Sequence, residues 1–204
     1  MADKQRYNTF TSPAGVAIFP WLTKADVKHD ASGVFHTDLS MSPEDAEDFQ
    51  AQLVSILNEF AAQELTAAQK VALKPRDVSR LEYSFPTFEE GATDEEKAAI
   101  RQSFVPEETG NILFRFKLKQ HVTTKAGETF TQEPVVVMSD TGARCTDPVY
   151  SGSIIRVRGQ VIPYSNAVAG EYGVTLRMKA VQVVELKTGT GDGGYWSDFG
   201  AEAA

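Results

Sequence analysis

Polar and apolar residues alternate with a period of two along several stretches of the chain, and this alternation predicts β-strands with two different faces. In the stretch 33–41, for example, Phe35, Thr37 and Leu39 alternate with His36 and Asp38. Turn residues such as Lys125-Ala126-Gly127-Glu128 separate the later stretches. We therefore expect five or six strands, at residues 16–22, 33–41, 111–123, 129–138, 153–162 and 173–186.

A different period, of three and four residues, appears after Met41 and predicts helix. Ser42 is a good N-cap and Pro43 suits the first helical position, so the first helix should begin there. It should run to about Ala62, with Lys74-Pro75 as the latest end. The capping-box sequence Thr93–Glu96 predicts a second, short helix, with residues 75–92 as a loop.

The order of these elements predicts a mainly β protein in which the helices form one insertion. We expect a single domain over residues 1–187, built as a small five-stranded barrel with a helical insertion at about 42–110. Residues 188–204 begin with a glycine-rich stretch that has the composition of a flexible linker. They are therefore expected to form a flexible tail.

Charge is unevenly distributed along the chain. The 204 residues carry a net charge of −8, which by itself argues against binding to a phosphate backbone. However, residues 1–110 carry −9 and residues 188–204 carry −3, whereas residues 111–187 carry +4. The strand-rich segment is therefore basic within an acidic protein, and it is the part expected to meet a charged partner.

The basic side chains of this segment recur two positions apart, which places them on one face of each strand. Glu185 is the one acid among residues 112–122, 154–162 and 174–185. Like charges on neighbouring strands repel, so their counter-charge should come from a polyanion. An ordinary solvated barrel exterior remains the simple alternative. The seven basic candidates are Arg115, Lys117, Lys119, Arg156, Arg158, Arg177 and Lys179.

Aromatic residues lie in or beside the strand ends, where they could stack on the bases of a single strand. Packing into the protein core is the competing explanation for each of them. The aromatic candidates for DNA binding are Trp21, Phe35, Tyr164 and Tyr172.

Motifs for catalysis are absent from the sequence. The three histidines, His29, His36 and His121, lack metal-ligand spacing, and Cys145 has no cysteine partner. No phosphate-binding loop, nucleophile elbow or zinc-protease motif occurs. We therefore expect a protein that is not an enzyme and that uses no cofactor and no metal.

Several segments, in order along the chain, resemble phage-encoded single-stranded DNA-binding proteins of the T-odd coliphage (podovirus) type. The similarity covers about two-thirds of the chain and omits most of residues 43–110. The matching segments are Phe10-Thr11-Ser12-Pro13-Ala14-Gly15, residues 33–39, Phe114-Arg115-Phe116-Lys117, residues 134–140 and residues 153–186.

This resemblance implies an oligonucleotide/oligosaccharide-binding (OB) barrel that coats single-stranded DNA without sequence preference during phage replication, recombination and repair. Lys117 and Tyr164 match DNA-binding positions of the family, whereas Ser32 stands where a basic residue is expected. The resemblance also implies that an acidic, aromatic tail contacts phage or host replication proteins. The tail residues concerned are Asp192, Trp196, Asp198 and Phe199.

Two other functions stay open at this stage. The barrel could be a protein-interaction or virion-assembly module that docks an acidic partner, or a nuclease, although no carboxylate cluster supports the latter. We expect a soluble protein, because no apolar run approaches the roughly 20 residues of a membrane span. The resemblance to phage proteins implies a location in the cytoplasm of an infected bacterial host. A homodimer is left open.

Overall fold

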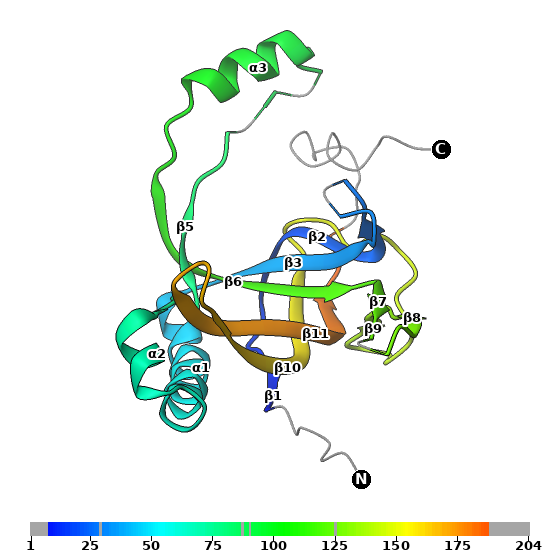
Figure 1. Ribbon diagram of the computed structural model, residues 1–204. Coiled ribbons are helices and arrows are strands. Elements are labelled where there is room, and N and C mark those ends of the chain that lie inside the picture. The colour runs from blue at the N-terminus through cyan, green and yellow to red at the C-terminus, as the bar shows by residue number, and fades with distance from the viewer. Residues whose placement is uncertain (1–7, 29, 87, 90, 125, 188–204) are drawn as a thin grey trace.

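The computed structural model is built around a strongly curved β-sheet, with α1 and α2 at one end and a long projection that rises from the same side of the sheet (Figure 1). It describes residues 8–187 apart from 29, 87, 90 and 125. The helices are α1 (Pro43–Gln63), α2 (Ala67–Ala72) and α3 (Asp94–Ser103). The strands are β1 (Thr9–Thr11), β2 (Gly15–Asp26), β3 (Val34–Met41), β4 (Lys74–Pro75), β5 (Arg80–Tyr83), β6 (Glu108–Lys119), β7 (His121–Thr123), β8 (Thr129–Thr131), β9 (Val135–Met138), β10 (Ile154–Asn166) and β11 (Glu171–Glu185).

Five of the strands pair in a closed circuit. β10 pairs with β2, β2 with β3, β3 with β6, β6 with β11, and β11 again with β10. Only the β6–β11 pairing in this circuit is parallel. Because the circuit returns to its starting strand, the five strands enclose one core, and the expectation of a mainly β barrel with inserted helices is confirmed.

The core is filled by the inward side chains of these strands together with one face of α1. Phe114 and Phe116 of β6 are fully buried, and Phe49 of α1 packs on Phe114 with ring centroids 5.0 Å apart. Phe10 completes the cluster, 5.6 Å from both Phe49 and Phe116. The helix therefore closes one end of the barrel, and its apolar stripe belongs to the same core as the strands.

The helix boundaries agree closely with the sequence pattern. α1 begins after Ser42, whose hydroxyl accepts a hydrogen bond from the Asp45 amide at 3.1 Å. α3 begins after Thr93 with the expected capping box to Glu96. The local chemistry of the caps was sufficient to predict where α1 and α3 begin, whereas α2 was not predicted as a separate helix.

The region expected to be a loop, residues 75–92, is more ordered than predicted. β4 pairs with β11, and β5 pairs with β6 in a two-stranded ribbon that carries α3. We call residues 80–110 the arm, and Figure 1 shows it extending well away from the barrel. β5 was missed because it is short and its pairing partners are 25 to 33 residues distant in sequence, from Tyr83↔Glu108 to Arg80↔Leu113.

The later strands also differ in detail from the expected ones. Residues 129–138 divide into β8 and β9, which belong to different sheets. Residues 163–172, expected to be a loop, are largely paired, because β10 and β11 continue as a hairpin to Asn166↔Glu171. Proline and polar residues suggested a break there, but the hairpin pairing overrides them.

The capped start of α1 gives a first test of the fold. Ser42→Ala should lower the free energy of unfolding by about 1 kcal/mol, because the N-cap hydroxyl that satisfies a helix amide is lost. Urea unfolding would measure this change. Ser55→Ala, at an exposed position within α1, is the matched control and should be neutral or slightly stabilising. Equal effects of the two substitutions would contradict the capping role.

Candidate nucleic-acid interface

The strand order brings the three basic strands side by side. β11 lies between β6 and β10, pairing Arg177 with Lys117 on one side and with Gln160 on the other. Directly paired residues point to the same side of a sheet, so all three sets of basic side chains point outward. We call their joint surface the basic face; it comprises Arg115, Lys117, Lys119, Arg156, Arg158, Arg177 and Lys179.

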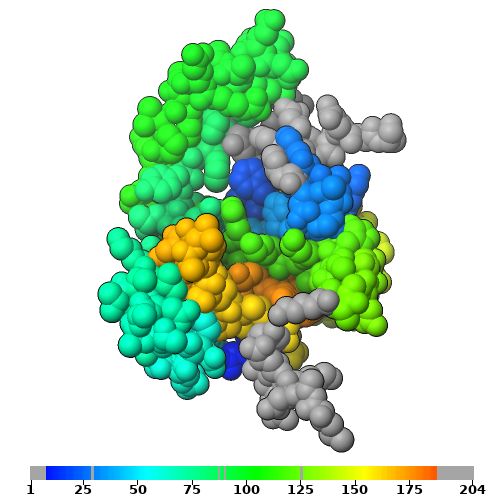
Figure 2. Space-filling model, in the orientation of Figure 1, coloured from blue at the N-terminus to red at the C-terminus, as the bar shows by residue number. Residues whose placement is uncertain are grey.

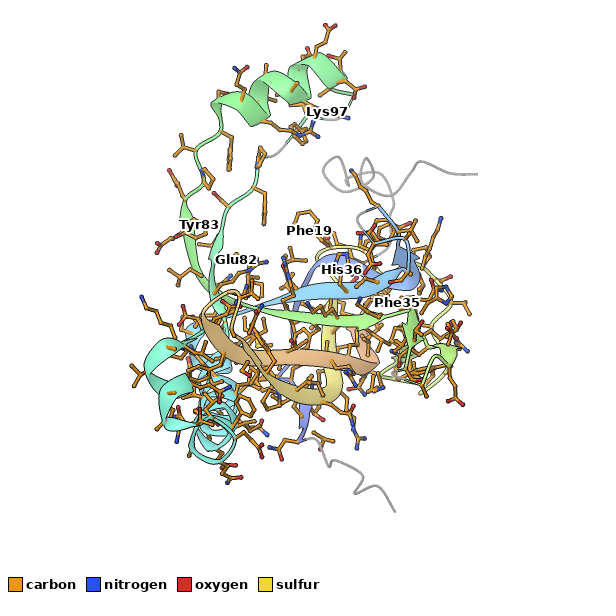
Figure 3. All side chains as sticks on the ribbon, viewed as in Figure 1. Phe19, Phe35, His36, Glu82, Tyr83 and Lys97 are labelled. Atoms are coloured by element: carbon orange, nitrogen blue, oxygen red, sulfur yellow. The ribbon has the colours of Figure 1, made fainter. Side chains whose placement is uncertain are left out.

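One row of residues crosses the outside of the barrel from β2 to β10. Trp21 pairs with His36, His36 pairs with Lys117, and Lys117 pairs with Arg177. The rings of Trp21 and His36 lie 6.5 Å apart, and His36 is labelled on β3 in Figure 3. The row therefore places an aromatic side chain at one end of a line of basic residues, as stacking and phosphate contact together would require.

Asp38 changes the charge balance at one edge of the basic face. This carboxylate is buried, with 7% of its side chain exposed, and it accepts two hydrogen bonds from Arg115, at 2.9 and 3.1 Å. Arg80 of the arm binds the same carboxylate. The bond to Asp38 raises the pKa of Arg115 above its ordinary value. The expectation that all seven basic residues lack local neutralisation is therefore wrong, because the pairing acid comes from the neighbouring strand β3.

The remaining basic residues are less compensated. Lys119 lies 3.6 Å from Asp30, whereas Lys117, Arg156 and Arg158 form no ion pair with any residue that the structure describes. The pKa of Lys179 is lowered, first by partial burial and then by the charge of Arg177. The positive charges in this part of the basic face therefore repel one another, and a bound anion would reduce that repulsion.

Tyr164 shares the outward face of the β10–β11 hairpin. It lies opposite Gly173, and its hydroxyl donates a hydrogen bond to Glu171 at 3.2 Å. Arg76 also binds Glu171, at 3.1 Å, and the Tyr164 hydroxyl and then Glu171 raise the pKa of Arg76. The Tyr164 ring is therefore held in a fixed, half-buried position beside a guanidinium group.

Two aromatic candidates are not where base stacking needs them. Phe35 is only 2% exposed and packs in the core, because its position in β3 points inward opposite Leu118. Tyr172 pairs with Ser165, so its side chain lies on the opposite face of the hairpin from Tyr164. Strand alternation separates them from the basic face, and we correct both expectations accordingly.

Residues from the insertion also join this surface, although sequence reasoning missed them. Arg76 reaches Glu171, and Arg80 reaches Asp38. Both lie in the segment taken as a loop, where no periodicity marks a face. Both arginines are visible in the sequence, but only the tertiary structure shows that Arg76 contacts β11 and that Arg80 contacts β3.

Little in the described part of the chain suggests other chemistry. No group of three histidine, cysteine or acidic residues within it could hold a metal ion. Cys145 is buried beside a recess of about 400 Å³ that Leu22, Thr23 and Arg144 also line. None of the described helices is both long and apolar enough to cross a membrane. The tail residues Asp192, Trp196, Asp198 and Phe199 lie outside the described residues.

Comparison with known proteins identifies the fold. No protein-family model and no curated protein matches the sequence. Among solved structures, the chain is similar to gp2.5, a single-stranded DNA-binding protein of bacteriophage T7. That match has 27% identity and a TM-score of 0.62, and it covers 95% of this chain and 98% of gp2.5.

The single-stranded DNA-binding protein of bacteriophage Enc34 also matches, with 10% identity, a TM-score of 0.51, and coverage of 92% of this chain and 98% of the truncated Enc34 chain. Its complex with single-stranded DNA gives 9% identity and the same TM-score, over 90% of this chain and 89% of that one. The chain therefore has the OB-type fold of phage single-stranded DNA-binding proteins, as the sequence resemblance implied.

The partly buried charge of Lys179, next to the charge of Arg177, gives a test that needs no ligand. Lys179→Gln should raise the free energy of unfolding near neutral pH, because it removes a partly buried charge next to Arg177. The pKa of Lys179 is lower in the folded protein than the ordinary 10.5. The charged side chain therefore lowers the free energy of unfolding at pH values below the folded-state pKa, and this destabilisation disappears as the pH rises past 10.5. Urea unfolding between about pH 7 and pH 11 should show the advantage of the variant shrinking. A difference that is constant with pH would contradict this crowding.

Proposed function

We propose that this protein binds single-stranded DNA without sequence preference and is not an enzyme. The observation that carries the proposal is the continuous basic face across β6, β11 and β10, with Trp21 in line with it. Binding of single strands by proteins combines such a basic track with aromatic stacking platforms. The fold shared with phage single-stranded DNA-binding proteins supports the same function.

In this proposal the basic side chains neutralise phosphates, and Tyr164 and Trp21 stack on bases. No described contact of the basic face selects one base over another, since lysine and arginine contacts to phosphate carry no sequence information. The protein would coat single strands exposed during phage DNA replication, recombination and repair, in the cytoplasm of the infected host. Contacts with replication proteins would be made through the tail.

The net charge of −8 is compatible with this function because the charges are segregated. The acidic residues of α1, such as Glu44, Asp45 and Glu47, lie on the helix that closes one end of the barrel, whereas the basic face covers its side. DNA would be attracted to one surface and repelled by the rest, which orients it on the barrel.

The salt dependence of affinity tests the electrostatic part of the proposal. A labelled oligo-dT should bind the wild type with a log–log salt slope of about −0.7 for each phosphate contacted. The double substitution Lys117→Gln and Arg177→Gln should weaken binding and reduce the slope by about 1.4. Fluorescence anisotropy at several salt concentrations would measure both.

Lys70→Gln is the control for this experiment, since it removes one positive charge from α2, away from the basic face. It should leave the slope unchanged. No oligonucleotide binding, or an equal loss in the control, would overturn the proposal and favour docking of an acidic protein instead.

Stacking is tested by comparing the two tyrosines of the hairpin. Tyr164→Ala should cost about 1–3 kcal/mol of binding free energy whatever the base sequence, whereas Tyr164→Phe keeps the ring and should cost far less. Tyr172→Ala, on the opposite face, should leave binding nearly unchanged. Titrations with oligo-dT and oligo-dA would show this. The reverse order of effects would remove Tyr164 from the interface.

A further inference from the structure

A second group of aromatic and basic side chains lies where the arm meets the barrel. Phe85 of the arm and Phe19 of β2 meet edge to face, with ring centroids 5.3 Å apart. Phe85 remains 37% exposed. Figure 3 shows Phe19 on the side of the barrel that faces the arm, and Figure 2 shows open space between the arm and the strands below it.

The backbone of β2 is distorted at this point in a way that aims Phe19 at the arm. Ile18 pairs with Asp38 but Trp21 pairs with His36, so three residue steps on β2 match two on β3. Phe19, inside this bulge, has φ of 50°, an unfavourable value for a bulky residue. Bulges commonly redirect side chains next to functional sites, and strained residues cluster there.

The strand register places the carboxylate that binds two arginines next to the residue before Phe19. Phe19 follows Ile18, the partner of Asp38, and Asp38 binds both Arg80 and Arg115. The two arginine side chains are 50% and 61% exposed, while the carboxylate between them is buried. The carboxylate thus fixes one edge of each guanidinium group and leaves donors on the other edges for an anion.

Further aromatic and basic side chains lie near the tip of the arm. Arg101 of α3 lies over the Phe88 ring, 5.0 Å from its centroid. Figure 3 shows Lys97 on the side of α3 that faces the barrel. The arm therefore carries both aromatic and basic side chains, although residues 80–110 contain eight acidic and three basic residues.

We propose that this junction is a binding site for one unpaired nucleotide of a DNA single strand. The base stacks on the exposed ring of Phe85, which Phe19 holds in place, and a neighbouring phosphate is bound by Arg80 and Arg115. In a duplex both faces of a base are covered by neighbouring base pairs, so only an unpaired, unstacked base can lie against such a ring, and the site favours single strands. This proposal rests on the proposed function and adds the arm to the surface that binds the strand.

Substitution of Phe85 tests the site. Phe85→Leu should weaken binding of oligo-dT roughly 5- to 150-fold, the effect of losing one stacked base. Phe85→Tyr, which keeps the ring, should bind like the wild type. Phe130→Leu is the control, because Phe130 is 47% exposed on β8, outside the basic face and the arm; it should not change affinity. Urea unfolding of each variant would check that the fold is intact.

Photocrosslinking gives a second readout that a purely structural role would not produce. An oligonucleotide that contains 5-iodouracil should crosslink to the tryptic peptide of residues 81–97, which carries Phe85. Unchanged affinity of Phe85→Leu, or crosslinks confined to peptides of β6, β10 and β11, would overturn the nucleotide site alone. Failure of the wild type to bind any oligonucleotide would overturn the proposed function itself.

Discussion

Pairing of β11 with one neighbouring and one distant strand of the chain is the constraint on which the rest of the structure depends. Its antiparallel pairing with β10 is a local hairpin, whereas its parallel pairing with β6 joins residues about 60 positions apart. The second pairing closes the barrel, buries Leu176 against Phe116, and sets Arg177 beside Lys117. The register of the β6–β11 pairing therefore determines both which residues meet in the core and which charges meet on the surface, because successive side chains of a strand point alternately inward and outward.

The same alternation explains why a surface with so many like charges can persist. Each outward lysine or arginine is flanked by inward residues such as Phe116 and Met178, which are fully buried. Burial of these apolar side chains stabilises the fold and offsets the repulsion between the outward positive charges. Asp38 and Asp30 relieve part of the repulsion, and the rest remains available to an external anion.

The arm extends this surface by different means. It has little core of its own, since α3 has no buried residue. It is held to the barrel by the pairing of β5 with β6 and by the contacts of Arg80 with Asp38 and of Phe85 with Phe19. Few buried contacts make such an element easy to displace.

The sequence by itself determined the elements whose signals are local. Ser42 and Thr93 marked the helix starts, and period-two alternation identified the main barrel strands and the outward side of Lys117 and Arg177. Tertiary structure alone decided what depends on pairing between distant segments. It placed Asp38 on Arg115, buried Phe35, turned Tyr172 to the other face, and brought Arg80 and Phe85 to the barrel. Alternation shows which residues share a face, but only strand order and register show which faces meet.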